Sequence, residues 1–131
     1  MKYGPLGLLL LLACSAPPTV VTVGSACRYD ADLTCETGSP RLLECRAQKW
    51  ALSADCRGPG GCVSDAMQTV CDTSGDTVGD HCSASSEGKA RCDPVAPFRI
   101  IRCARGVFEV AIECPQQTRC GLDPDAGLVC G

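Results

Sequence analysis

The cysteines of this chain fall into two ladders with matching spacings. Successive cysteines of the first ladder are separated by 7, 9, 10, 5 and 8 residues, and those of the second by 9, 10, 10, 5 and 9. Self-similarity at a fixed period, here about 55 residues, indicates a tandem duplication. The first ladder comprises Cys27, Cys35, Cys45, Cys56, Cys62 and Cys71, and the second comprises Cys82, Cys92, Cys103, Cys114, Cys120 and Cys130.

The residues between the cysteines repeat as well. Each unit has a glycine three residues before its first cysteine, a segment that runs from an arginine through two apolar residues to its third cysteine, and an aromatic residue five positions later. The matched positions are Gly24 and Gly79, residues 41–45 and 99–103, and Trp50 and Phe108. We therefore expect one module over residues 24–72, a linker over 73–78 and a second module over 79–131.

The two units contain too few large side chains for a core of ordinary size. Cysteine is enriched to the level of a disulfide scaffold in a short secreted chain, so disulfides must supply part of the stability, about 2–4 kcal/mol each. The aromatic residues of the two units are Tyr29, Trp50, Phe98 and Phe108. An even number of cysteines from Cys27 onward permits complete pairing.

Six cysteines allow 15 connectivities, among which sequence alone does not choose. We expect the first cysteine of each module to pair with the third, the second with the sixth and the fourth with the fifth. The last pair is favoured because a five-residue, glycine-rich loop can close Cys56 onto Cys62.

Short strands are the predicted regular structure. Segments 41–45 and 50–55 flank a polar turn, and residues 108–113 alternate, with Phe108, Val110 and Ile112 on one face. That alternation is the period of a half-buried strand. A third short strand ends each unit, and no stretch carries a helical stripe. The sequence predicts a small, disulfide-rich, mainly β fold of two tandem three-stranded modules with three disulfides each.

The N-terminus has the features of an export signal. Residues 6–12 form an apolar run that is too short for a bilayer core, which takes about 20 residues, but typical of a signal peptide. The run leads into Leu11-Leu12-Ala13-Cys14, which resembles the lipobox of bacterial lipoproteins.

The lipobox resemblance implies a signal peptide over residues 1–13 and a lipidated tether over 14–23. Cys14 would carry acyl chains such as palmitate, and these would hold the exported protein on a membrane, with Ser15 permitting transfer to the outer membrane of the cell envelope. The alternative is ordinary secretion after cleavage near Ala16.

Two further resemblances concern the cysteine ladders. The ladders resemble those of Cys-rich repeat lipoproteins of myxobacteria, a family that implies no particular activity. The segment Cys45…Trp50…Cys56 is more weakly similar to six-cysteine chitin-binding modules. Two interpretations of Trp50 and Phe108 stay open: they stack against a ligand, or each covers a disulfide as the small core of its module.

Composition and spacing exclude several classes of function. The net charge of −3, with both signs interspersed, offers no basic stripe for nucleic acid. The cysteines are too far apart for a zinc site, so we expect no metal and no cofactor. The acidic segment 72–80 lacks the dense ligand order of a calcium loop, and we expect it to be a solvated linker.

Catalysis has little support in the sequence. The position of the single histidine, His81, is occupied by Ala26 in the first unit. No nucleophile, base and orienting group occur together in a motif that both units share. Arg41 and Arg99 either brace a neighbouring carboxylate or are exposed.

We therefore expect a non-enzymatic, lipid-anchored envelope or surface protein whose two modules bind a protein or another ligand bivalently. One alternative is a pair of carbohydrate-binding modules that use Trp50 and Phe108. Another is a secreted protease inhibitor, which presents Arg57-Gly58 or Arg119 on the loop between the fourth and fifth cysteines.

Overall fold

The computed structural model describes residues 16–17 and 19–131. The predicted signal peptide and Cys14 lie outside the described residues. The described chain is mainly β, with ten short strands and one 3₁₀ turn. In this part of the chain, no helix is long and apolar enough to cross a membrane.

Each module consists of a three-stranded antiparallel sheet followed by a separate two-stranded hairpin. The first sheet has the order β1 (Leu33–Cys35), β2 (Leu42–Arg46), β3 (Lys49–Ala54), and its hairpin joins β4 (Cys62–Ser64) to β5 (Thr69–Cys71). In the second module the sheet has the order β6 (Ala90–Cys92), β7 (Arg99–Ala104), β8 (Val107–Glu113), after the 3₁₀ turn η1 (Ala84–Ser86). The second hairpin joins β9 (Cys120–Asp123) to β10 (Gly127–Cys130).

The predicted mainly β fold with three-stranded units is confirmed, but the third strand of each sheet is not the one expected. The terminal strands β5 and β10 belong to the hairpins, whereas β1 and β6 complete the sheets. These two strands are three residues long and end at the second cysteine of their module. Three residues are too few to show an alternation of polarity, which is why the sequence did not predict them.

Two-residue turns join the second strand of each sheet to the third. Ala47 (φ 49°) and Gln48 (φ 62°) both have positive φ, as do Arg105 (φ 55°) and Gly106 (φ 79°). Positive φ at both central residues is the type I′ geometry, whose twist matches that of the flanking strands. The pairing of these strands also shifts register at the same position in both modules, between Leu42 and Leu43 and between Ile100 and Ile101.

The twelve cysteines from Cys27 onward form six disulfides, and both modules use one connectivity. The bridges are Cys27–Cys45, Cys35–Cys62 and Cys56–Cys71 in the first module, and Cys82–Cys103, Cys92–Cys120 and Cys114–Cys130 in the second. The predicted first-to-third pairing is confirmed. The second-to-sixth and fourth-to-fifth pairings were wrong, since the second cysteine pairs with the fifth and the fourth with the sixth.

The hairpins explain the corrected pairing. The fifth and sixth cysteines are register partners across each hairpin, Cys62 opposite Cys71 and Cys120 opposite Cys130. The loop over 57–61 does not simply return to Cys56, because it wraps around Asp72. The Gly58 N–H donates to the Asp72 carbonyl at 2.8 Å, and a side chain at Gly58 would overlap the Asp72 carboxylate.

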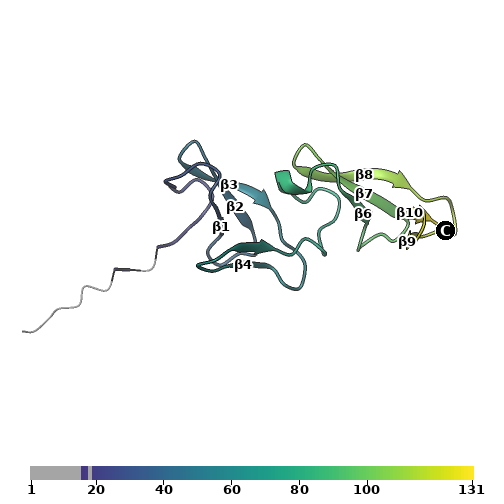
Figure 1. Cartoon of the computed structure of the whole chain (residues 1–131), viewed down its shortest axis with the longest axis horizontal. Coiled ribbons are helices and arrows are strands. Elements are labelled where there is room, and N and C mark those ends of the chain that lie inside the picture. Colours follow the sequence, from purple (N-terminus) through teal and green to yellow (C-terminus); the bar gives the residue numbers. More distant parts are fainter. Residues whose placement is uncertain (1–15, 18) are drawn as a thin grey trace, which may run out of the picture.

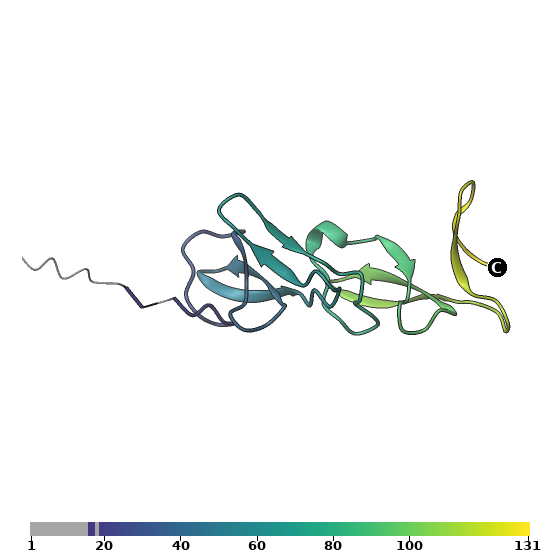
Figure 2. The ribbon, with the colours of Figure 1, turned by 90° about the horizontal axis from the view of Figure 1, so that it is seen from below.

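Two small clusters make up the core. In the first module Leu42, Ala54 and Cys56 pack against the cysteines of the hairpin, and in the second Cys82, Ile101, Cys103 and Phe108 pack together. The modules lie end to end (Figures 1 and 2). The described N-terminal residues lie at one end, and the C-terminus and the hairpin β9–β10 lie at the other.

Candidate functional site

The two matched aromatic residues have different surroundings. Phe108 is only 4% exposed, packs against the cysteines Cys82 and Cys103, and is covered by the Arg91 guanidinium, 4.5 Å from the ring centroid. Ligand stacking by Phe108 was therefore a wrong prediction, because the ring is part of the core. Trp50 is half-buried beside its register partner Cys45, and its ligand role stays a prediction.

A buried carboxylate follows the second cysteine of each module and pairs with an arginine at the start of the next strand, where Arg41 directly precedes β2 and Arg99 is the first residue of β7. Glu36 pairs with Arg41 at 2.5 Å, and Asp93 pairs with Arg99 at 2.8 Å. Arg41 and Arg99 thus brace carboxylates, as one of the two predicted interpretations held. Burial by itself raises the pKa of Asp93, but hydrogen bonds from Thr77 and the neighbouring backbone, together with Arg99, outweigh it and lower the pKa.

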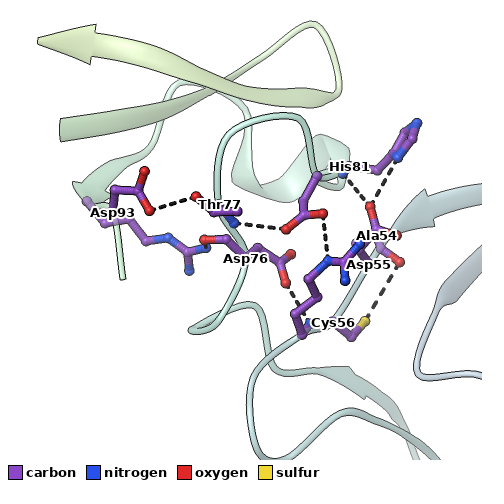
Figure 3. Close-up of polar contacts among 10 residues, drawn as sticks. Ala54, Asp55, Cys56, Asp76, Thr77, His81 and Asp93 are labelled. Carbon is purple, nitrogen blue, oxygen red and sulfur yellow. Dashed lines mark hydrogen bonds and ion pairs between the residues drawn. The ribbon is translucent and has the colours of Figure 1, made fainter. Parts of the chain in front are cut away.

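Two carboxylates of the acidic linker are buried rather than solvated, which corrects the expectation for residues 72–80. Asp76 is 0% exposed and Asp80 is 7% exposed. Both carboxylates accept hydrogen bonds from Arg57 of the first module, at 2.6 Å from its backbone N–H to Asp76 and at 2.6 Å from its Nε to Asp80 (Figure 3). The charges in the sequence predicted hydration, but in the folded chain Arg57 binds both carboxylates and forms an ion pair with Asp80.

Further contacts complete this module junction. The Asp55 carboxylate accepts from the His81 backbone N–H at 2.6 Å and lies 3.1 Å from the His81 ring Nδ1 (Figure 3). The Asp55 N–H donates to the His81 carbonyl at 3.2 Å. Gly75 lies so close to the Arg57 carbonyl that an added Cβ would overlap it. The junction is thus a set of direct contacts that fix one module against the other.

The charged groups of the junction influence one another. Hydrogen bonding and charge attraction from Asp80 raise the pKa of Arg57. Burial is the largest influence on the pKa of Asp76 and raises it, although the hydrogen bond from Arg57 opposes the shift. One oxygen of Asp76 has no hydrogen-bond partner among the described residues. The charged form of Asp76 is therefore less favourable here than it would be in water.

Among the described residues, the junction lacks the further groups that catalysis or metal binding would need. Although His81 and Asp55 resemble the base and orienting group of a catalytic triad, no described hydroxyl or thiol is hydrogen-bonded to the other ring nitrogen of His81. Within residues 16–17 and 19–131, no group of three or more His, Cys, Asp or Glu side chains is arranged to hold a metal ion.

In the two loops considered for protease inhibition, the backbone groups beside the arginines already form contacts within the chain. Gly58 N–H is bonded to Asp72 and the Arg57 carbonyl packs against Gly75. Arg119 exchanges both backbone hydrogen bonds with Gly131, at 3.1 and 3.0 Å. A substrate-like inhibitor must offer free backbone groups beside its arginine, and neither loop does so.

The second module has an open groove at the end that lies away from the junction. Its volume is about 450 Å³, and its lining residues are Pro97, Phe98, Cys114, Pro115, Gln116, Gln117, Thr118 and Arg119. The Phe98 ring is 51% exposed. The sequence predicted no site at Phe98. This residue directly precedes Arg99, where the first module has Pro40, and that difference between the two units was the signal that could have found it.

The corresponding end of the first module differs in shape and chemistry. Its pocket, lined by residues that include Pro40, Asp55 and Arg57, is about 200 Å³ in volume. Arg57 uses its backbone N–H and guanidinium to hold the second module. Its counterpart Pro115 has neither group, so the end of the second module could not hold a third module by the same bonds.

No known protein-family model, curated protein or solved structure matches this chain.

Proposed function

We propose that this chain is a non-catalytic, lipid-anchored protein of the bacterial cell envelope that displays a binding groove at the end of a rigid, disulfide-stapled body. The observation that carries the proposal is the placement of the ends. The described N-terminal residues, next to the proposed Cys14 anchor, lie at one end of the body (Figures 1 and 2). The groove around Phe98 and Arg119 belongs to the other end.

The module junction supports display rather than flexible tethering. A flexible linker would let the groove fold back toward the membrane, whereas buried Asp76 and Asp80 bonded to Arg57 hold the second module in one orientation. The disulfides support export, since such bonds persist in oxidising compartments. Several acyl chains would give stable anchoring, whereas a single chain gives marginal binding.

The two modules present different surfaces to a partner. The first module uses its terminal loop to hold the second, and the second leaves the equivalent region open. We therefore propose one principal binding end rather than two equivalent ones. The partner is a protein or a glycan outside the cell membrane, and nucleic acid is not expected.

Expression with the native leader in a Gram-negative host tests the anchor. We expect the protein in the membrane fraction, with acyl groups on Cys14 and a mass lowered by the hydrogens lost in six disulfides. A Cys14→Ala variant should leave the membrane fraction. An unacylated mature protein that begins near Ala16 would instead establish ordinary secretion, and free thiols would contradict the oxidised fold.

A further inference from the structure

The geometry points to an acidic saccharide as the ligand of the terminal groove, with the Phe98 ring as stacking platform and the Arg119 guanidinium as the partner of a sugar carboxylate. This inference rests on the proposed display function and names the class of ligand for the groove.

Phe98 is a half-exposed aromatic residue with a fixed backbone and a fixed cationic neighbour. It is 51% exposed, and the guanidinium of Arg99 lies over it at 5.7 Å from the centroid. Arg99 is fixed in turn by its ion pair with buried Asp93 at 2.8 Å. The Phe98 carbonyl accepts from the Cys114 N–H at 2.7 Å, which ties its backbone to a disulfide. A ring fixed in this way loses little freedom when a ligand stacks on it.

The polar groups of the groove are free to contact a ligand. The side chains of Gln116, Gln117 and Arg119 form no hydrogen bond or ion pair within the described chain, and the lining contains no acidic residue. Amides both donate and accept, which suits hydroxyl groups, while the guanidinium fork matches a carboxylate. A flat apolar ring beside amides and one unpaired cation matches the apolar face, hydroxyls and carboxylate of an acidic sugar.

An extended peptide fits the groove less well. Peptides that bind by strand addition need unpaired main-chain groups on the receptor. Much of the backbone here is already used: Arg119 pairs with Gly131, the Cys120 N–H donates to the Pro97 carbonyl at 2.7 Å, and the Thr118 N–H donates to Pro115. The groove therefore has no continuous edge of unpaired main-chain groups for an added strand, and recognition rests mainly on side chains.

The test uses the full oxidised lipoprotein in detergent and titration calorimetry with two acidic probes, tetragalacturonate and tetramannuronate, and the methyl ester of each. We expect at least one acid to bind more tightly than its ester. Phe98→Ala should weaken that binding roughly tenfold, the size expected for a lost aromatic stack. Arg119→Gln should reduce the affinity for the acid to that for the ester.

Tyr29→Ala is the matched control, because Tyr29 is an aromatic residue of the first module that is 63% exposed and lies outside the groove. It should bind like the parent protein, and circular dichroism should show that all variants keep the parent fold. Failure of both acids to bind would overturn the inference, as would binding that survives Phe98→Ala. A tetraglutamate peptide that binds as tightly as the sugars would replace it with a general carboxylate site. Membrane anchoring through Cys14 is measured separately, so a negative titration would leave the proposed anchor intact.

Discussion

The ion pair between Arg57 and Asp80 should couple the stabilities of the two modules. The contact is 2.6 Å long, and the carboxylate is only 9% exposed, but the arginine side chain is 59% exposed. A hydrogen bond to a charged group contributes about 1.5–3 kcal/mol, whereas a fully exposed pair contributes about 0.2–1 kcal/mol. Because water reaches one partner only, we expect a coupling energy of about 1 kcal/mol, between these limits.

A double-mutant cycle measures this coupling. Arg57→Gln, Asp80→Asn and the double variant should be compared by urea unfolding at pH 7 with the disulfides intact. Each single variant should lose the whole coupling energy, so the double variant should be less destabilised than the sum of the two singles by about that amount. The matched control is Arg46 with Glu44, a pair at 2.8 Å whose side chains are 54% and 24% exposed, which should show less than about 0.5 kcal/mol.

Hydrogen exchange provides the local measurement for the same prediction. The Arg57 amide donates to buried Asp76, so it should be protected in the parent protein and exchange faster when Asp80 is changed. Additive losses, or a coupling no larger than that of the Arg46–Glu44 control, would refute the conclusion that buried charges hold the junction rigid. A flexible tether between independent modules would give that result.

Three further predictions concern the module interiors. Asp93→Asn should cost about 3 kcal/mol at pH 7, because it breaks a buried ion pair. Since the folded pKa of Asp93 is lowered, the loss relative to the parent should be full above the ordinary pKa of about 3.9 and should shrink as the pH falls through the lower folded value. Urea unfolding at several pH values would show this. Phe108→Ala should cost about 3–5 kcal/mol, measured by thermal unfolding, and a loss below about 1 kcal/mol would contradict its burial. Replacing both Cys35 and Cys62 by serine should lower the free energy of unfolding by about 3.5 kcal/mol, the loop-closure entropy over 27 residues. Peptide mapping of the parent protein should recover this bridge. Recovery of a bridge from Cys56 to Cys62 would contradict the fold.

The comparison of Trp50 with Phe108 shows where a repeat in the sequence stops predicting equal environments. Both residues follow the third cysteine by the same distance. Phe108 is covered by Arg91 of β6, but the residue at the equivalent position of β1, directly before the second cysteine, is Thr34. The short threonine side chain does not reach across the ring as arginine does, so Trp50 stays half-buried while Phe108 joins the core.

The sequence by itself determined the duplication, the mainly β character and the reliance on disulfides, because cysteine spacing, alternation and the scarcity of large side chains are properties of the chain before it folds. Only the tertiary structure decided which cysteines pair, that Asp76 and Asp80 are buried, and that a groove forms beside Phe98. Each of these depends on how a hairpin or a linker packs against residues far away in the sequence. Arg57 is the reason the linker is held: its guanidinium pairs with Asp80 and its backbone N–H binds Asp76, and these two contacts offset part of the cost of taking both carboxylates out of water.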